Sequence, residues 1–160
     1  FNGGDVNLFR YVGNGPVNYI DPSGQLAFFW HAGITYVAAR NSGQGILESA
    51  KLAWDAMAED RSTLSHDPDL TKIHAMGGNL GDRYQTRDEA IDAANTYINN
   101  ISNPISGRIH AAQDLPIHAG ESMEGFSFSS MHTLLDITGG GTIGQAYRNT
   151  LNVLNRRCRK

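Results

Sequence analysis

The sequence predicts an all-α fold, a single helical domain at residues 27–160, preceded by a short turn-rich and β leader at residues 1–26. Apolar residues recur at helical spacing across residues 44–60. Thr86 and Glu89 have the spacing of a capping box, which begins a helix. The first 26 residues instead contain glycine, asparagine and proline turns without a helical period.

The composition is that of one globular domain. The chain has 160 residues, and its 40% of hydrophobic residues can supply a core. Charged residues are 18%, which excludes a highly charged disordered tail. The formal net charge is −3, so the chain lacks the basic surface that is typical of nucleic-acid binders. The lone Cys158 cannot form an internal disulfide. We find no signal peptide, and the apolar run at residues 28–30 is too short to cross a bilayer.

The predicted elements follow in chain order. Turns at residues 14–16 and 21–24 flank a short strand at residues 17–20. Residues 61–85 are expected to form a loop, Pro116 to bend or end a helix, and the glycines at residues 139–141 to break one. We expect helices at residues 29–39, 44–60, 86–100, 105–118, 129–138 and 142–157.

Two His-x-x-x-Asp pairs dominate the polar residues of the helical region. His110 with Asp114, and His132 with Asp136, are each four residues apart, so each pair lies on one face of its helix. His118 lies four residues beyond Asp114 and can reach the same or an adjacent site. Imidazole nitrogen and carboxylate oxygen are ligands that suit zinc.

Two further histidines and one carboxylate extend this pattern. His31 lies on a helix of apolar and small residues, where a buried imidazole needs a hydrogen-bond partner or a metal. His74 follows the predicted loop, and Asp60 ends the preceding helix. Each residue alone fits a hydrogen-bonded core histidine or a helix salt bridge, but together they predict a buried multi-metal site inside a helical bundle. The expected metal ligands are His31, His74, His110, Asp114, His118, His132 and Asp136.

Residues 7–24 contain Arg10-Tyr11, Asn14-Gly15-Pro16 and Asp21-Pro22-Ser23-Gly24 in that order. This order resembles the end of the core domain of Rhs/YD-repeat proteins. The resemblance implies that the segment closes a β-shell, that a variable toxin domain follows, and that the chain is cut near Leu26.

The order of histidines and carboxylates from about residue 30 to residue 137 resembles the zinc-dependent phospholipase C/P1-nuclease superfamily. The resemblance implies an all-helical enzyme with two or three zinc ions. It makes Asp114 a bridging ligand and pairs the carboxylate of Asp60 with His74. Two features depart from the family pattern: the gap from Asp114 to His118 is short, and Trp30 adjoins His31 instead of lying far ahead of it.

These resemblances imply a phospholipase C-like toxin that hydrolyses phosphate esters of phospholipid head groups. Asp60 is the candidate base or water-orienting group, and Asp60 and Asp114 are the candidate catalytic residues. The expected partners are a phospholipid or other phosphodiester, a cognate immunity protein and the Rhs shell before release, with no stable nucleic-acid binding. We expect a secreted protein, or one that a bacterial secretion system delivers into target cells.

Two alternatives remain open at this point. A P1-like nuclease on the same scaffold would need an aromatic platform for base stacking, for which Tyr84 or Tyr97 could serve. A non-enzymatic, metal-stabilised binding domain would hold a coordinatively saturated ion. A metallopeptidase is disfavoured because the sequence has no His-Glu-x-x-His motif. Residues 28–30, or Met123, Phe126 and Phe128, could contact lipid, but core packing is the more common role of such apolar residues.

Overall fold

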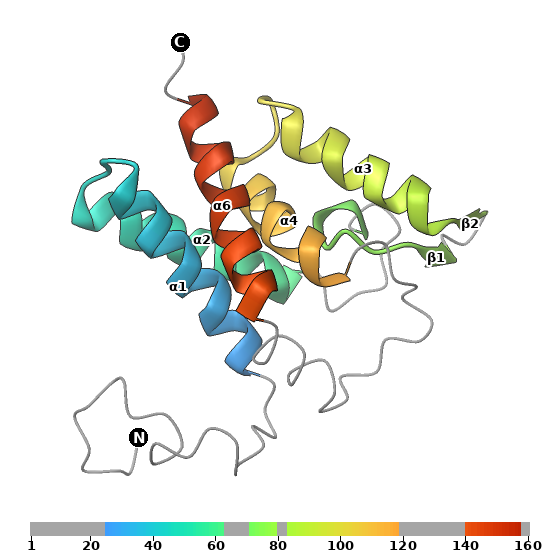
Figure 1. The fold of residues 1–160 in the computed structure, drawn as a ribbon, viewed down its shortest axis with the longest axis horizontal. Coiled ribbons are helices and arrows are strands. Elements are labelled where there is room, and N and C mark those ends of the chain that lie inside the picture. Colours follow the sequence, from blue (N-terminus) through green and yellow to red (C-terminus); the bar gives the residue numbers. More distant parts are fainter. Residues whose placement is uncertain (1–24, 63–70, 80–82, 119–139, 158–160) are drawn as a thin grey trace.

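The computed structural model describes residues 25–62, 71–79, 83–118 and 140–157, and this part of the chain is almost entirely helical (Figure 1). The all-α prediction is therefore confirmed. The predicted strand at residues 17–20, the predicted helix at residues 129–138 and Cys158 lie outside the described residues. No helix in the described ranges combines the length and apolar character needed to cross a membrane.

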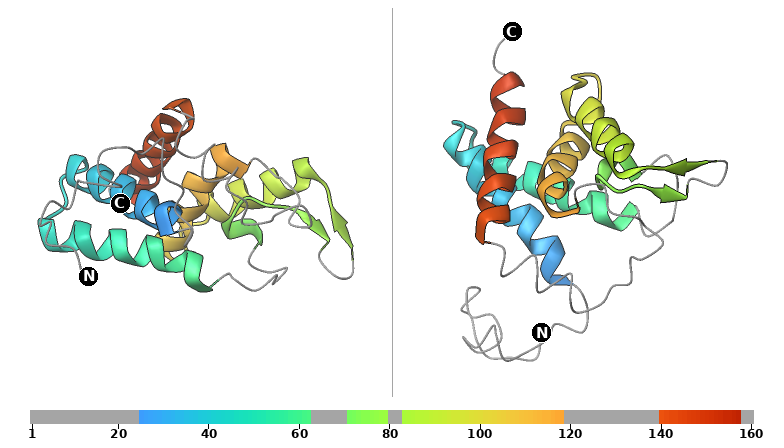
Figure 2. Two further views of the ribbon diagram at one scale, coloured as in Figure 1. Left: turned by 90° about the horizontal axis from the view of Figure 1, so that it is seen from below. Right: turned by 45° about the vertical axis from the view of Figure 1, so that its right-hand side comes forward.

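The first two helices form an antiparallel pair. α1 (Gln25–Asn41) and α2 (Ile46–Ser62) lie side by side in both views of Figure 2. Gly43, with φ of 89°, makes the turn between them, a backbone conformation that glycine adopts at little cost. The small residues Ala38, Ala39 and Ala56 are buried where these helices pack into the core.

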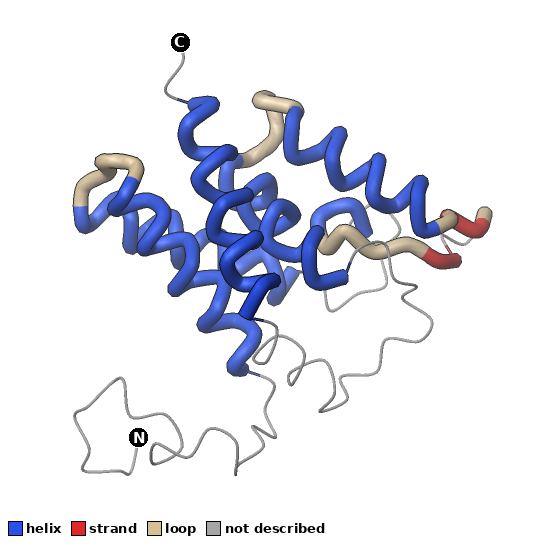
Figure 3. The backbone as a smooth tube through the Cα atoms, in the orientation of Figure 1, coloured by secondary structure: helices blue, strands red, loops and turns tan. Residues whose placement is uncertain are grey.

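The segment predicted as a loop at residues 61–85 contains some regular structure. A short 3₁₀ helix, η2 (Thr71–Ile73), is followed by a small antiparallel hairpin of β1 (Gly78–Asn79) and β2 (Tyr84–Gln85). Among the described residues this hairpin is the only strand structure, and it lies at the far end of the molecule from α1 (Figure 3). Two-residue strands are too short to leave a period-2 pattern in the sequence.

The third helix begins at the predicted capping box. The Thr86 side chain accepts a hydrogen bond from the Glu89 backbone N–H, and the Glu89 carboxylate accepts one from the Thr86 N–H at 2.8 Å. These two bonds satisfy backbone donors that a helix start leaves free. α3 (Arg87–Asn99) therefore begins directly after Thr86, at the predicted boundary.

α4 (Ile105–His118) is the central helix and packs against α1, α2, α3, η2 and α6. All its residues from Gly107 to Asp114 are buried. Pro116 was expected to bend or end the helix, but α4 continues to His118. Proline cannot donate to the Ala112 carbonyl four residues earlier, and the Asn149 side chain donates to that oxygen instead, at 2.9 Å.

The contribution of this side-chain hydrogen bond to the free energy of unfolding can be measured. We expect Asn149→Ala to lower the free energy of unfolding by about 1 kcal/mol, because the Ala112 carbonyl loses its hydrogen bond. In a Pro116→Ala background the backbone N–H returns, so the same change should cost much less. Chemical denaturation of the four proteins of this double-mutant cycle measures the coupling. Asn152→Ala, exposed on the same helix, is the control, and equal effects of Asn149→Ala in both backgrounds would contradict the interpretation.

The last described helix, α6 (Gly140–Arg157), packs against α4 and α1. The glycines at residues 139–141 were predicted to end the preceding helix, which lies outside the described residues, and α6 begins at Gly140 instead of the predicted residue 142. Helix ends tolerate glycine better than helix interiors, which explains the difference. Val153 and Leu154 of α6 complete the core with Leu52 and Ile109.

Candidate metal centre

Three elements bring four of the predicted ligands together. α1 carries His31, α4 carries His110 and Asp114, and His74 directly follows η2. His110 and Asp114 are four residues apart on α4, so their side chains lie on one face, as predicted. All of α4 around them is buried, so these polar groups face protein and not solvent.

The Asp114 carboxylate lies between three imidazole rings. Its Oδ1 atom is 3.2 Å from Nε2 of His31. Its Oδ2 atom is 3.0 Å from Nδ1 of His74 and 3.1 Å from Nε2 of His110. The Asp114 side chain is only 2% exposed, so each oxygen interacts with histidine rather than with bulk water. The two oxygens thus face two different sides of the site.

A backbone carbonyl group of α2 holds the ring of His110 through its Nδ1 atom. Its Nδ1 atom lies 3.0 Å from the carbonyl oxygen of Ala56 on α2. A carbonyl can only accept, so Nδ1 carries the hydrogen, and in a neutral ring Nε2 then presents a lone pair. This lone pair faces the Asp114 oxygen. The contact with Asp114 is favourable when Nε2 is protonated, which makes the ring cationic, or when a metal cation lies between the two atoms. Nδ1 of His74, at 3.2 Å, is the other group near this nitrogen.

His74 reaches the site through an unusual backbone turn. Ala75, fully buried, has φ of 52°, in the left-handed region that alanine rarely adopts. This conformation turns the chain immediately after His74, whose Nδ1 also lies 3.2 Å from Nε2 of His110. The other ring nitrogen of His74, Nε2, is buried without a hydrogen-bond partner among the described residues. Strained backbone of this kind is often found at functional sites.

Electrostatics favours the ionised form of Asp114. Burial alone would raise its pKa, but positive charge on His110 and His31 and hydrogen bonds from His110 and His74 hold the pKa well below its usual value. The carboxylate therefore stays negatively charged at neutral pH. A metal site needs this protonation state.

The depressed pKa has a consequence for acid stability. A carboxyl group with a lower pKa in the folded state stabilises the protein above its unfolded pKa of about 3.9, and this stabilisation is lost as the pH falls through the folded pKa. We therefore expect metal-free protein and its Asp114→Asn variant to differ less in unfolding free energy as the pH drops below about 4. Urea titrations at several pH values measure this difference. A difference that grows on acidification would contradict the assignment.

The donor set fits a metal ion. His31, His110 and Asp114 are buried, and each offers one ligand atom within 4.8 Å of the others, so this group could hold a metal ion. Zinc bonds of about 2.0–2.1 Å in a tetrahedral arrangement separate ligand atoms by about 3.3 Å. The distance from Oδ1 of Asp114 to Nε2 of His31, 3.2 Å, and the distance from Oδ2 to Nε2 of His110, 3.1 Å, are each close to that separation.

The other predicted site residues either lie outside the candidate metal group or have side chains that the structure does not describe. His118 lies on α4, half-buried, and does not belong to the group of described residues that could share an ion. Asp60 is on α2, but its side chain is outside the described part of the structure. His132 and Asp136 also lie outside the described residues.

The sequence did not single out the residues behind His31. Gln113, fully buried on α4, has its Oε1 atom 2.7 Å from Nδ1 of His31. Its Nε2 atom donates to the hydroxyl oxygens of Thr35 at 2.9 Å and Thr150 at 3.0 Å. Gln113 is adjacent to Asp114 in sequence, but nothing in the pattern indicates that α1 and α6 supply its partners.

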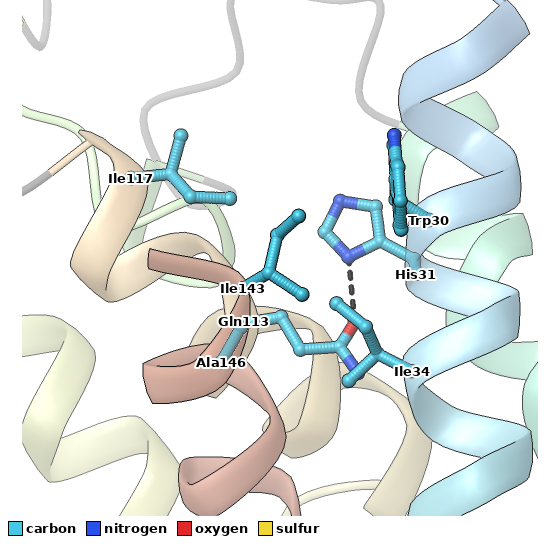
Figure 4. A pocket seen from close by; sticks show the side chains of 7 residues that line it. All are labelled: Trp30, His31, Ile34, Gln113, Ile117, Ile143 and Ala146. Atoms are coloured by element: carbon cyan, nitrogen blue, oxygen red, sulfur yellow. Dashed lines mark hydrogen bonds between the residues drawn. The ribbon is translucent and has the colours of Figure 1, made fainter. Parts of the chain in front are cut away.

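A mostly apolar pocket adjoins His31, and Figure 4 shows its lining. Trp30 and Ile34 come from α1, Gln113 and Ile117 from α4, and Ile143 and Ala146 from α6. Trp30 is 37% exposed, so it lies at the boundary between this pocket and the surface. Apolar walls next to a charged site exclude water and strengthen electrostatic interactions inside it.

Comparison with known proteins adds no assignment: no family model, no curated protein and no solved structure matches this chain.

Proposed function

We propose that this chain is a zinc-dependent phosphodiesterase of the phospholipase C type. The observation that carries the proposal is the position of the Asp114 carboxylate, whose Oδ1 faces His31 and whose Oδ2 faces His74 and His110. A carboxylate that bridges two metal ions offers one oxygen to each. The resemblance of the histidine and aspartate order to the phospholipase C/P1-nuclease superfamily supports the same arrangement.

Each side chain has a role in this proposal. His31, His110 and one oxygen of Asp114 would hold one ion, and His74, whose Nδ1 lies 3.0 Å from Oδ2 of Asp114, would bind a second ion beside it. His118, His132 and Asp136 would complete the cluster, and Asp60 would orient the attacking water. Bound zinc supplies positive charge that stabilises the phosphoryl oxygens and activates water near neutral pH. The carbonyl of Ala56 keeps His110 in the orientation and protonation state that a ligand needs.

The apolar surroundings favour a lipid substrate. Phe29 is 64% exposed and Trp30 37% exposed on α1, directly before His31. An apolar surface beside a phosphodiester site suits the acyl or glycerol part of a phospholipid. Phe28 has a side chain outside the described set, and Met123, Phe126 and Phe128 lie in the segment that the structure does not describe.

The nuclease alternative has less support from aromatic placement. The ring of Tyr97 packs between α3 and α4, where a Cβ on Gly107 would meet its hydroxyl at 2.5 Å. Tyr84 is 61% exposed, but it belongs to the distal hairpin. The aromatic ring that could stack on a base beside the candidate metal centre is instead that of Trp30. A saturated, non-catalytic metal domain is the second alternative.

The cellular role is part of the same proposal. The likeness of residues 7–24 to the end of an Rhs core suggests a toxin tip that is cut near Leu26 and delivered into target cells. A hydrolase of phospholipids would endanger the cell that makes it. We therefore propose a cognate immunity protein as the partner that blocks the metal centre.

The decisive experiment combines metal analysis with two substrates. Purified full-length chain is assayed for bound zinc and for hydrolysis of a phosphocholine ester and of single-stranded DNA, each with and without chelator. We expect zinc in the protein and ester cleavage that chelator removes. Cleavage of DNA alone would replace the phospholipase with the nuclease, and bound zinc without either activity would favour the binding domain.

A further inference from the structure

Gln113 occupies the centre of a buried hydrogen-bond relay that ends at His31. The relay begins on α6, where the Thr150 hydroxyl donates to the Ala146 carbonyl at 2.9 Å. It passes through Gln113 on α4, whose side chain is fully buried, and reaches Nδ1 of His31 on α1. Figure 4 shows the Gln113 side chain reaching the His31 ring.

The relay determines which amide atom faces which neighbour. The Thr150 hydroxyl donates its hydrogen to the Ala146 carbonyl, so the hydroxyl oxygen of Thr150 can only accept a hydrogen bond from Gln113. The amide group facing Thr150 must therefore be the NH₂ group, and its second hydrogen goes to Thr35. The amide oxygen is left to face His31 at 2.7 Å.

This orientation fixes the hydrogen on the His31 ring. An amide oxygen can only accept, so Nδ1 of His31 must donate to it. The lone pair of a neutral His31 is then on Nε2, the atom that lies 3.2 Å from Oδ1 of Asp114. A lone pair and a carboxylate at that distance repel each other unless a cation lies between them or the ring is protonated.

We propose that Gln113 is a positioning residue that holds His31 in its Nδ1–H form and thereby makes Nε2 the metal-binding atom. The inference rests on the proposed zinc site. His110 obtains the same form independently from the Ala56 carbonyl, so the two histidines present equivalent nitrogen atoms to the two oxygens of Asp114. Loss of Gln113 should weaken the His31 side of the site and leave His110 unchanged.

The test uses three variants that separate hydrogen bonding from packing. Gln113→Met fills a similar volume without an acceptor for His31, and Gln113→Glu keeps that acceptor. Thr150→Val removes the hydroxyl that orients the amide but keeps the branched shape. Zinc affinity of the full chain should fall about 10–100-fold in Gln113→Met, fall less in Thr150→Val, and remain near wild type in Gln113→Glu. Equal losses in the Met and Glu variants would overturn the proposal, because a packing role does not distinguish them.

The second readout does not depend on metal. Nitrogen-15 NMR of the imidazole rings, with and without zinc, reports which ring nitrogen carries hydrogen. In the wild-type chain Nδ1 of His31 should carry it in both states, and this preference should be lost in Gln113→Met while the His110 signals persist. A His31 ring with hydrogen on Nε2 alone would overturn the proposal. Failure to bind zinc with the Nδ1–H form intact would instead remove the proposed function and leave the role of Gln113 standing.

Discussion

We expect Asp114→Asn to abolish both zinc binding and hydrolysis. The carboxylate supplies an oxygen to each side of the centre, and the amide that replaces it carries no charge to balance the cations. The loss of zinc affinity should exceed the roughly 10–100-fold that follows removal of an outer hydrogen-bond partner. Isothermal titration with zinc and the phosphocholine ester assay measure the two effects.

The matched control for this variant is Asp92→Asn on α3, where the carboxylate is exposed. Its zinc affinity and activity should equal those of the wild-type chain. The metal-free Asp114→Asn protein should also unfold more easily, by about 3 kcal/mol, because buried imidazoles lose their charged partner. Full activity in Asp114→Asn would remove the proposed centre altogether.

Zinc should raise the melting temperature strongly. The proposed ligands come from α1, α4 and the turn after η2, so an ion that binds them only in the folded chain would stabilise it. At a free zinc concentration about 1,000 times the dissociation constant the gain is about 4 kcal/mol. For a chain of this size that corresponds to roughly 8–16 °C. Differential scanning fluorimetry with zinc, and then with excess chelator, measures the shift and its reversal.

Magnesium and a histidine variant provide the controls for this shift. Magnesium prefers oxygen ligands and should leave the melting temperature unchanged. His110→Ala should lose most of the zinc effect, because its Nε2 faces the shared carboxylate. An equal zinc shift in His110→Ala and in wild type would place the stabilising ion elsewhere.

Local patterns predicted much of the fold. The capping box of Thr86 and Glu89 located the start of α3 because its two hydrogen bonds involve neighbouring residues only. The spacing of His110 and Asp114 placed both on one helix face for the same reason. The bounds predicted for α4, residues 105–118, are the observed ones, and the hydrogen bond that Pro116 cannot donate comes from Asn149, a residue 37 positions from Ala112.

The outer partners of the centre could not be predicted from the sequence. Gln113 matters because Thr35 and Thr150, from two other helices, are brought to its amide group. The Ala56 carbonyl that fixes His110 is a backbone atom, so no residue type identifies it. Interactions of this kind depend on how helices cross, which periodicity does not determine.

The long chain separations within the centre link metal retention to motion. His31 meets Gln113 across 82 residues, and His74 meets Asp114 across 40, so no single helix holds the ligands by itself. If α1 detaches briefly from α4, the ion loses a ligand while the rest of the core stays packed. The rate at which a chelator removes zinc would then measure how often α1 detaches. Amide hydrogen exchange in α1 should occur at a similar opening rate.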